Sequence, residues 1–323
     1  TVQKEIIQLL KDIQQETGMS IIFISHDLAL VKEIADRVLV MYKGAIVEEA
    51  SAEILFKTPE HTYTKALLNA RPSLENRLLK LPTIKDYLTN TLQTDIEIPE
   101  DRARRLKELY ETEPILEVRN VEKTYISKAG LFSASRVVKA VQDVSFSLYE
   151  GETLGLVGES GCGKSTLGNV ILQLDRASAG SILYRGTDIT KLKGRALRAL
   201  RREIQIIFQD PYASLNPRLT VGQAIIEPME VHKLFSTKEQ RKEEAIEILH
   251  RVGLESSHFN RYPHEFSGGQ RQRIGIARTI AVQPKLIICD ESVSALDISV
   301  QAQVLNLLNE LKELNSNIHP FPL

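Results

Sequence analysis

The chain has 323 residues, enough for about two average domains. Its 41 Lys and Arg residues nearly balance 42 Asp and Glu residues, so no basic excess favours nucleic acid as the main partner. No apolar stretch approaches the ~20 residues that a membrane-spanning helix needs, and the sequence contains no signal peptide.

The first part of the chain predicts an α/β pattern. An apolar run at 20–25 predicts a buried strand that ends on His26, and the turn Lys43-Gly44 predicts a hairpin between strands 37–42 and 45–48. Hydrophobic periodicity predicts helices at 3–16, 28–35, 51–56 and 61–70. Residues 71–114 contain four prolines and many polar residues, which is typical of a linker, with one helix at 101–110.

A second set of elements begins near residue 115. We expect strands at 115–125 and 137–149, and a buried strand at 153–157 that leads directly into a glycine-rich loop. Further on, helices are predicted at 164–174, 268–281 and 299–314, and strands at 204–208 and 286–289.

The two ends of the chain repeat one another. Thr1-Val2-Gln3 and the helix behind it match Ser299-Val300-Gln301, 298 residues later. The repeat predicts a C-terminal remnant of a first domain at 1–70, a linker at 71–114, a similar second domain at 115–316 and an irregular tail at 317–323. By the same spacing, the counterpart of His26 would fall at position 324, so we expect both ends of the chain to be cut.

The glycine-rich loop carries the strongest chemical signal. It comprises Gly158, Glu159, Ser160, Gly161, Cys162, Gly163, Lys164, Ser165 and Thr166. A strand before it and a helix after it form the context of a phosphate-binding loop, in which backbone N–H groups and the helix N-terminus face phosphate oxygens. Lys164 supplies a point charge for the β- and γ-phosphates, and the Ser165 hydroxyl suits Mg²⁺. The sequence therefore predicts ATP binding.

Two carboxylates follow the apolar strand at 286–289. Ligands bind at the carboxyl ends of strands in open α/β sheets. Asp290 can hold Mg²⁺, and Glu291 is placed to orient or deprotonate a water that attacks the γ-phosphate. Without the glycine loop upstream, two solvated acids at a strand end would be the favoured interpretation.

Other candidate residues are weak signals when each is considered alone. The segment Ser267, Gly268, Gly269 and Gln270 predicts either a plain helix cap or an anion site. Tyr125 and Gln209 carry no information by themselves, and a lone strand-end histidine such as His26 is more often structural than catalytic. Two cysteines, Cys162 and Cys289, indicate no disulfide framework and are expected to be small apolar fillers.

Taken in order, these residues resemble the ATP-binding subunits of ABC transporters. The segments 208–217, 261–266 and 58–68 are similar to the oligopeptide/dipeptide importer group, whose fused members carry two such domains on one chain. The resemblance implies an α/β P-loop NTPase core with an antiparallel β subdomain and a helical signature subdomain, preceded by the remnant of a similar domain.

The resemblance also implies roles for individual residues. Tyr125 would stack on adenine, Glu291 would be the catalytic base, and Ser165, Gln209 and Asp290 would serve Mg²⁺. Ser267 and Gly269, with Gly268 and Gln270, would contact ATP held by a partner domain, and Asp297 would bridge the two domains. His26 would be the switch histidine of the first domain. Ser292 stands where the family usually has proline, and Phe266 stands where it usually has leucine.

The resulting prediction is an ATPase that energises peptide import, with ATP and Mg²⁺ as cofactors. The implied partners are transmembrane permease subunits, a second ABC ATPase domain and, indirectly, a solute-binding protein, with no nucleic acid. The implied location is peripheral, at the cytoplasmic face of the inner membrane. Nickel or another small solute remains an open substrate, because related importers share these motifs.

Three alternatives accompany this prediction. One is an ABC ATPase without a transport role, acting for example on ribosomes or chromosomes. Another is a nucleotide-binding module with little turnover, because the second-domain histidine and the first phosphate loop are not in the sequence. A third places the strand 21–25 beside 286–289, so that His26 replaces the missing histidine.

Overall fold

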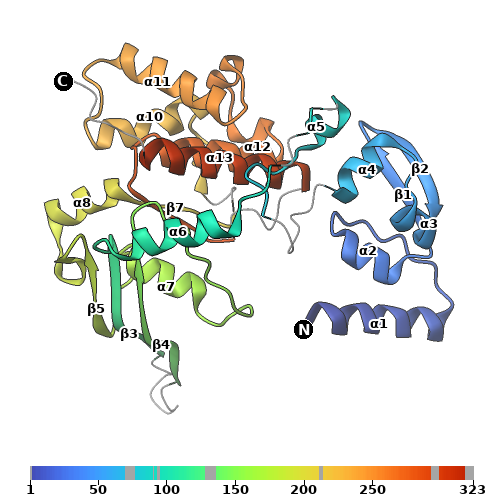
Figure 1. Ribbon diagram of the computed structural model, residues 1–323, viewed down its shortest axis with the longest axis horizontal. Helices are drawn as coiled ribbons and strands as arrows, with labels where there is room; N and C mark the ends of the chain where they lie inside the picture. The colour runs from blue at the N-terminus through green and yellow to red at the C-terminus, as the bar shows by residue number, and fades with distance from the viewer. Residues whose placement is uncertain are drawn as a thin grey trace. The chain divides into compact units, whose positions relative to one another are not determined.

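The computed structural model describes residues 2–69, 77–89, 91–92, 95–127, 136–210, 214–291 and 298–316. The chain divides into two compact units, one formed by Thr1–Glu97 with Leu296–Asn306, the other by Ile98–Ala295 with Leu307–Leu323. Helix α13 (Ile298–Ser316) contributes residues to both units. Figure 1 shows the helices and strands of the two units, coloured along the chain.

The first unit is built around a β-hairpin covered by short helices. β1 (Arg37–Tyr42) pairs antiparallel with β2 (Ala45–Ser51). Its helices are α1 (Val2–Thr17), α2 (Leu28–Ile34), α3 (Ala52–Lys57), α4 (Thr62–Asn69) and α5 (Ile84–Leu88). Alternate residues of β1 enter a core with α2 and α3, as period-two strands and amphipathic helices require. Asp27 and Ser51 accept backbone hydrogen bonds as the N-caps of α2 and α3.

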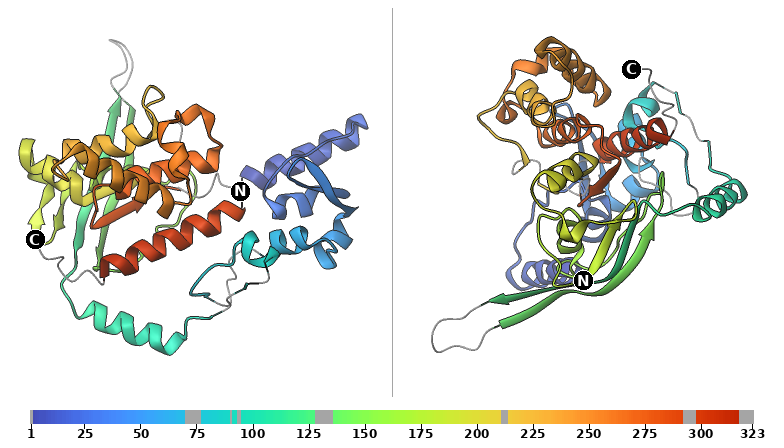
Figure 2. Two further views of the ribbon diagram at one scale, coloured as in Figure 1. Left: turned by 90° about the horizontal axis from the view of Figure 1, so that it is seen from above. Right: turned by 90° about the vertical axis from the view of Figure 1, so that its left-hand side faces the viewer.

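The second unit begins with α6 (Pro99–Tyr110) and contains an antiparallel sheet of order β4-β3-β5-β6. These strands are β3 (Leu116–Ser127), β4 (Arg136–Leu148), β5 (Ala179–Tyr184) and β6 (Thr187–Asp188). A separate parallel pair joins β7 (Ile204–Ile207) to β8 (Leu286–Cys289). Figure 2 shows the long β3–β4 hairpin extending from this unit.

Helices flank both sheets of the second unit. They are α7 (Lys164–Ile171), α8 (Gly194–Glu203), α10 (Val221–Val231), α11 (Lys238–Arg251) and α12 (Gly268–Ile280), with short 3₁₀ turns η1 (Ile189–Lys191), η2 (Ser256–Asn260) and η3 (Pro263–Glu265). One buried apolar cluster joins β3, β4, β5 and α7, and Ile204 of β7 is buried in it as well. The antiparallel sheet, the parallel pair and the helices α10–α12 confirm the predicted α/β architecture with β and helical subdomains.

Two predicted buried strands are wrong. Residues 20–25 form no strand, and Ile22 and Ile24 are each 92% exposed. Residues 153–157 also form no strand, and Val157 is 94% exposed. An apolar run becomes a buried strand only where neighbouring strands accept its hydrogen bonds, and no described strand pairs with either segment. The hypothesis that strand 21–25 docks beside 286–289 required a strand that the structure does not contain.

The other predicted elements are confirmed within a few residues at their ends. Both copies of the repeat are helical, as α1 and α13. The cysteines depart from expectation, because Cys162 and Cys289 are both exposed rather than buried fillers. Within the described residues, no helix is both long enough and apolar enough to cross a bilayer.

Candidate nucleotide site

The glycine loop of the second unit is tightly constrained at its end. Gly163 has φ +104° and is the N-terminal residue before α7, which begins at Lys164. A Cβ at Gly163 would lie 2.1 Å from the carbonyl oxygen of Ala140, so no other residue fits without backbone movement. Strand β4 therefore fixes where the loop turns into the helix, and with it where the helix N-terminus points.

Lys164 lies across the loop that contains it. Its Nζ donates to the carbonyl oxygens of Gly158, at 2.7 Å, and Glu159, at 2.9 Å. The same Nζ is 3.9 Å from Oε1 of Glu291, and the Lys164 side chain is only 18% exposed. The ammonium group thus sits between the loop and the carboxylate that follows β8.

The parallel pair β7–β8 brings two polar residues into register. Ile207 pairs with Cys289, so Gln209 and Glu291 each follow two residues beyond the last paired position. Nε2 of Gln209 donates to Oε2 of Glu291 at 2.8 Å. Glu291 has φ +44°, a left-handed conformation that is unusual for a glutamate and turns the chain directly after the strand. The parallel register explains why two residues 82 positions apart meet.

A second contact joins the loop helix to the strand end. The Ser165 hydroxyl donates to Oδ1 of Asp290 at 2.9 Å, and the Asp290 N–H donates to the carbonyl of Ile207 at 3.1 Å. Lys164 and Ser165 at the start of α7 therefore meet Asp290 and Glu291 at the end of β8. The structure brings together the predicted lysine, serine, glutamine and both acids.

These oxygen groups fit a magnesium ion. Mg²⁺ takes oxygen ligands, usually one or two carboxylates together with substrate phosphates and waters. Asp290 supplies a carboxylate and Ser165 a hydroxyl, 2.9 Å apart. No cluster of three or more His, Cys, Asp or Glu side chains suited to a metal occurs among the described residues.

Tyr125 lies on β3, and the residue is 42% exposed. Its hydroxyl donates to Oδ2 of Asp175 at 2.6 Å, and Nζ of Lys123 lies 4.7 Å from its ring centroid. Sequence reasoning missed Lys123 and Asp175. Only the spacing of Lys123 two residues before Tyr125 on one strand could have indicated the first, because such residues share a face.

The predicted signature segment forms a helix start. Ser267 is the N-cap of α12, and a capping box joins it reciprocally to Gln270. The N–H of Gln270 donates to the Ser267 hydroxyl at 3.3 Å, and the N–H of Ser267 donates to the Gln270 side chain at 3.1 Å. These hydrogen bonds confirm the predicted cap. Ser267 and Gly268 are exposed, so the N-terminus of α12 faces solvent.

Two further predicted site residues are His26 and Asp297. His26 is exposed in the first unit, directly before Asp27, the N-cap of α2. Asp297 lies outside the described residues, as do Ser292 and the residues 211–213 that follow Gln209.

Comparison with known proteins decides the family. A family described as ABC transporter matches residues 141–294, which include the loop, Gln209 and both acids. A family described as oligopeptide/dipeptide transporter, C-terminal region, matches residues 47–96. The glutathione import ATP-binding protein GsiA of Pectobacterium atrosepticum is 49% identical over 318 residues, which are 97% of this chain and 50% of that protein. The chain belongs to the ATP-binding subunits of ABC transporters, in the oligopeptide/dipeptide group.

Further relatives agree with this membership. The GsiA protein of Escherichia coli K12 is 49% identical over 315 residues, again covering 97% of this chain and 50% of the relative. The chain thus spans about half the length of these curated relatives. Among solved structures, the dimeric post-hydrolysis state of the ATP-binding cassette MJ0796, bound to ADP and Pi, is 32% identical with a TM-score of 0.56. That match covers 62% of this chain and 84% of that one. This ABC ATPase fold is therefore one that binds nucleotide.

Proposed function

We propose that the chain binds and hydrolyses ATP to energise the import of peptides through an ABC transporter. The observation that carries the proposal is the pair of contacts Ser165–Asp290 and Gln209–Glu291, which join the phosphate-loop helix and the end of β7 to the two acids after β8. These contacts hold a hydroxyl, an amide and two carboxylates in one cluster, and the Lys164 ammonium lies 3.9 Å from Glu291. The substrate class is supported by the match at residues 47–96 and by relatives named for glutathione import.

The bound nucleotide would contact side chains that here contact one another. The Lys164 ammonium, held on loop carbonyls, would turn to the β- and γ-phosphates, whose charge it neutralises. Glu291 would accept a proton from the attacking water. Gln209, which is hydrogen-bonded to Glu291, would orient the carboxylate and the water. Mg²⁺, held by Ser165, Asp290 and Gln209, would neutralise charge developing on the phosphates. The Tyr125 ring would stack on the adenine.

The helix start at Ser267 supports a role across a domain interface. Its exposed N-terminus is suited to an anion, since N–H groups and the helix dipole both favour negative charge there. We assign Ser267 and Gly269 to the γ-phosphate of ATP bound by a partner ABC domain, and Asp297 to the bridge between those domains. His26 would serve as switch histidine for a site of the first domain.

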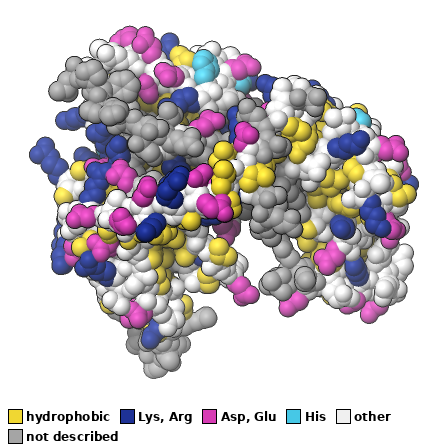
Figure 3. Space-filling model, viewed as in Figure 1, with side chains coloured by type: hydrophobic (Ala, Val, Ile, Leu, Met, Phe, Trp, Pro, Cys, Tyr) yellow, Lys and Arg dark blue, Asp and Glu magenta, His cyan; other side chains and the backbone are white. Residues whose placement is uncertain are grey.

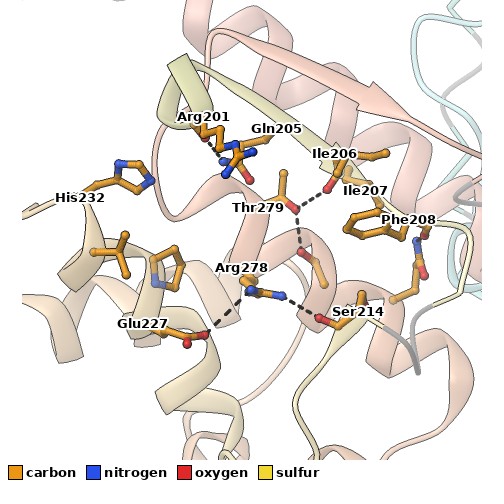
Figure 4. A pocket seen from close by; sticks show the side chains of 14 residues that line it. Arg201, Gln205, Ile206, Ile207, Phe208, Ser214, Glu227, His232, Arg278 and Thr279 are labelled. Carbon is orange, nitrogen blue, oxygen red and sulfur yellow. Dashed lines mark hydrogen bonds and ion pairs between the residues drawn. The ribbon is translucent and has the colours of Figure 1, made fainter. Parts of the chain in front are cut away.

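A cavity of about 310 Å³ in the second unit is suited to a permease subunit. It lies between the end of β7, α10 and α12, and its apolar lining includes Phe208, Pro228 and Val231 (Figure 4). Arg278 extends along one wall, where it donates to the carbonyl of Ser214 at 2.6 Å. Because Phe208 immediately precedes Gln209, an element seated in this cavity is linked by one residue to the catalytic cluster.

The cavity is bordered by positive charge. Figure 3 shows Lys and Arg side chains gathered around α8. The exposed basic residues of α8 and of the short segment before it are Lys191, Lys193, Arg195, Arg198, Arg201 and Arg202. Desolvation by burial, with Arg202 and Arg198 nearby, lowers the pKa of His232 on the cavity wall. A partner helix with an apolar face and an acidic flank complements this surface. The subunit would then be peripheral to the inner membrane, with a solute-binding protein acting through the permease.

Peptide uptake tests the proposal with a matched pair of variants. Val231 lines the cavity and is 55% exposed. Val137 on β4 is equally exposed, at 55%, but does not line the cavity. We expect Val231→Asp to abolish co-purification with the permease subunits and uptake of a labelled tripeptide, while ATP binding is retained. Val137→Asp should leave both unchanged. Energised uptake of nickel without peptide would reassign the substrate, and co-purification with ribosomes or DNA instead of permease would overturn the transport role.

A further inference from the structure

A buried lysine and an aspartate hold the Tyr125 ring from behind. Asp175 accepts the Tyr125 hydroxyl at 2.6 Å and the Lys123 ammonium at 2.5 Å, one on each carboxylate oxygen. The backbone N–H of Arg176 adds a third hydrogen bond at 2.8 Å. The carboxylate is thus fixed by three donors, and through it the end of the tyrosine ring is fixed as well.

Lys123 occupies one face of the ring. Its side chain is 11% exposed, and Nζ donates to the carbonyl of Arg176 at 2.9 Å in addition to Asp175. The same Nζ is 4.7 Å from the Tyr125 ring centroid, within the range of a cation–π contact. Since the Tyr125 residue is nevertheless 42% exposed, the surface left to a ligand lies mainly away from the ammonium group.

The group is also tied to the phosphate-loop helix. Thr166, the last residue of the loop motif, lies near enough to the Tyr125 hydroxyl to lower the pKa of Tyr125 slightly against the larger effect of Asp175. The N–H of Asp175 donates to the carbonyl of Asn169 on α7 at 3.2 Å. The aromatic ring is therefore held at a fixed place relative to α7, whose first residues are Lys164 and Ser165.

We propose that Lys123 and Asp175 are positioning residues that present one face of Tyr125 to a purine base at a fixed spacing from the phosphate loop. This inference rests on the proposed stacking role of Tyr125 and adds the residues that control it. Lys123 and Asp175 would raise the affinity for ATP only through the contact between Tyr125 and the base. If the stacking ring were free to rotate, the protein would bind the base more weakly, because binding would then also have to restrict the rotation of the ring.

The charge states agree with this geometry. Hydrogen bonds from Lys123 and Tyr125 lower the pKa of Asp175, and the hydrogen bond to Asp175 raises the pKa of Tyr125. At neutral pH Asp175 is therefore a carboxylate and Tyr125 a neutral phenol. The neutral phenol retains its proton and donates it in a hydrogen bond to the Asp175 carboxylate, which holds the ring in place.

The test compares ATP with inorganic tripolyphosphate, which carries the phosphates without the base. Affinities of both probes are measured by calorimetry on the full chain. Asp175→Asn and Lys123→Met are the test variants, and Lys139→Met is the control, because Lys139 is an exposed lysine on neighbouring β4. We expect the two test variants to lose ~3–10-fold in ATP affinity, with unchanged tripolyphosphate affinity. Lys139→Met should change neither.

A second set of variants separates positioning from stability. Tyr125→Ala should abolish the difference between the two probes, and adding Asp175→Asn to it should have no further effect, since coupled residues are not additive. Equal losses for both probes in Asp175→Asn, or no loss of ATP affinity, would overturn the positioning role. If Tyr125→Ala leaves the ATP advantage intact, the stacking role itself fails, which is a distinct result. Thermal melting of every variant identifies any that is unfolded. Lys123→Arg, which keeps the positive charge, should bind ATP more tightly than Lys123→Met.

Discussion

The hydroxyl of Ser165, at the start of α7, donates to the carboxylate of Asp290, at the end of β8, over 2.9 Å and 125 residues of sequence. This contact joins the phosphate loop to the edge of the parallel strand pair. It also places two oxygen ligands where a metal bound to ATP phosphates would need them.

Removing the Asp290 charge or the Ser165 hydroxyl should reduce the effect of magnesium on ATP binding. We expect Asp290→Asn and Ser165→Ala to weaken Mg²⁺ affinity by ~10–100-fold, because each takes away a ligand or the group that orients it. ATP affinity measured with Mg²⁺ and with EDTA checks this, and the two values should converge in both variants. A variant that retains the full magnesium dependence would exclude that residue from the metal site.

Glu291 separates binding from hydrolysis. Glu291→Gln keeps the shape and the hydrogen bond from Gln209 but removes the base, so turnover should fall by ~10²–10⁴-fold while ATP affinity is retained. Phosphate release and ATP binding are measured on the same preparation. Glu243→Gln, an exposed glutamate on α11, is the control and should leave both quantities unchanged. If the unmodified chain already shows only trace turnover, the binding-module alternative is favoured.

The sequence predicted the local elements of this site better than its sheet. The loop, α7 and the acids after β8 were predictable because glycine spacing and strand-end charge are local signals. The meeting of Gln209 with Glu291 required the register of β7 and β8, which neither strand encodes alone. Burial of 153–157 was predicted from apolar content, yet Val157 is exposed, because burial depends on strands elsewhere in the chain.

Tyr125 illustrates a second limit. The sequence could name it only by family resemblance; of its anchors, only Lys123 had a local signal, its place two residues before Tyr125 on one strand. Asp175 lies 50 residues away, beyond α7, and a single aspartate after a helix has many uses. The sheet β3–β4 and helix α7 must first pack before the three side chains meet.

Gly163 should tolerate no side chain. Gly163→Ala adds a Cβ 2.1 Å from the Ala140 carbonyl at φ +104°, so the loop must move and ATP binding should be lost. We expect a cost of ~1–3 kcal/mol or more in the free energy of unfolding. Gly186 has φ +74° with nothing within 4 Å, so Gly186→Ala should cost only about 1 kcal/mol and retain binding. Denaturant melts and ATP titrations of the pair compare the two; equal effects would contradict the proposed clash.

His232 should make stability depend on pH. Burial, with Arg202 and Arg198 nearby, lowers its pKa in the folded state below the ordinary 6.5. The unfolded chain therefore binds the proton more readily, so the free energy of unfolding falls as pH drops through about 6.5 and below. His232→Gln should flatten this part of the pH profile measured by thermal melting. His250→Gln, at an exposed position on α11, should leave the slope in place. An unchanged slope in His232→Gln would contradict the assignment.

Ser267 and Thr237 offer the same cap on two helices with different proposed roles. Each accepts a backbone hydrogen bond from the third residue of its helix, within a capping box completed by Gln270 or Gln240. Replacing either by alanine should therefore cost about 1 kcal/mol of stability. Only Ser267→Ala should also abolish ATP hydrolysis in the assembled transporter, because only that helix start is assigned to the phosphate of a partner domain. Binding of ATP to the chain itself should survive both changes. Equal loss of turnover in the two variants would mean that Ser267 acts through stability alone.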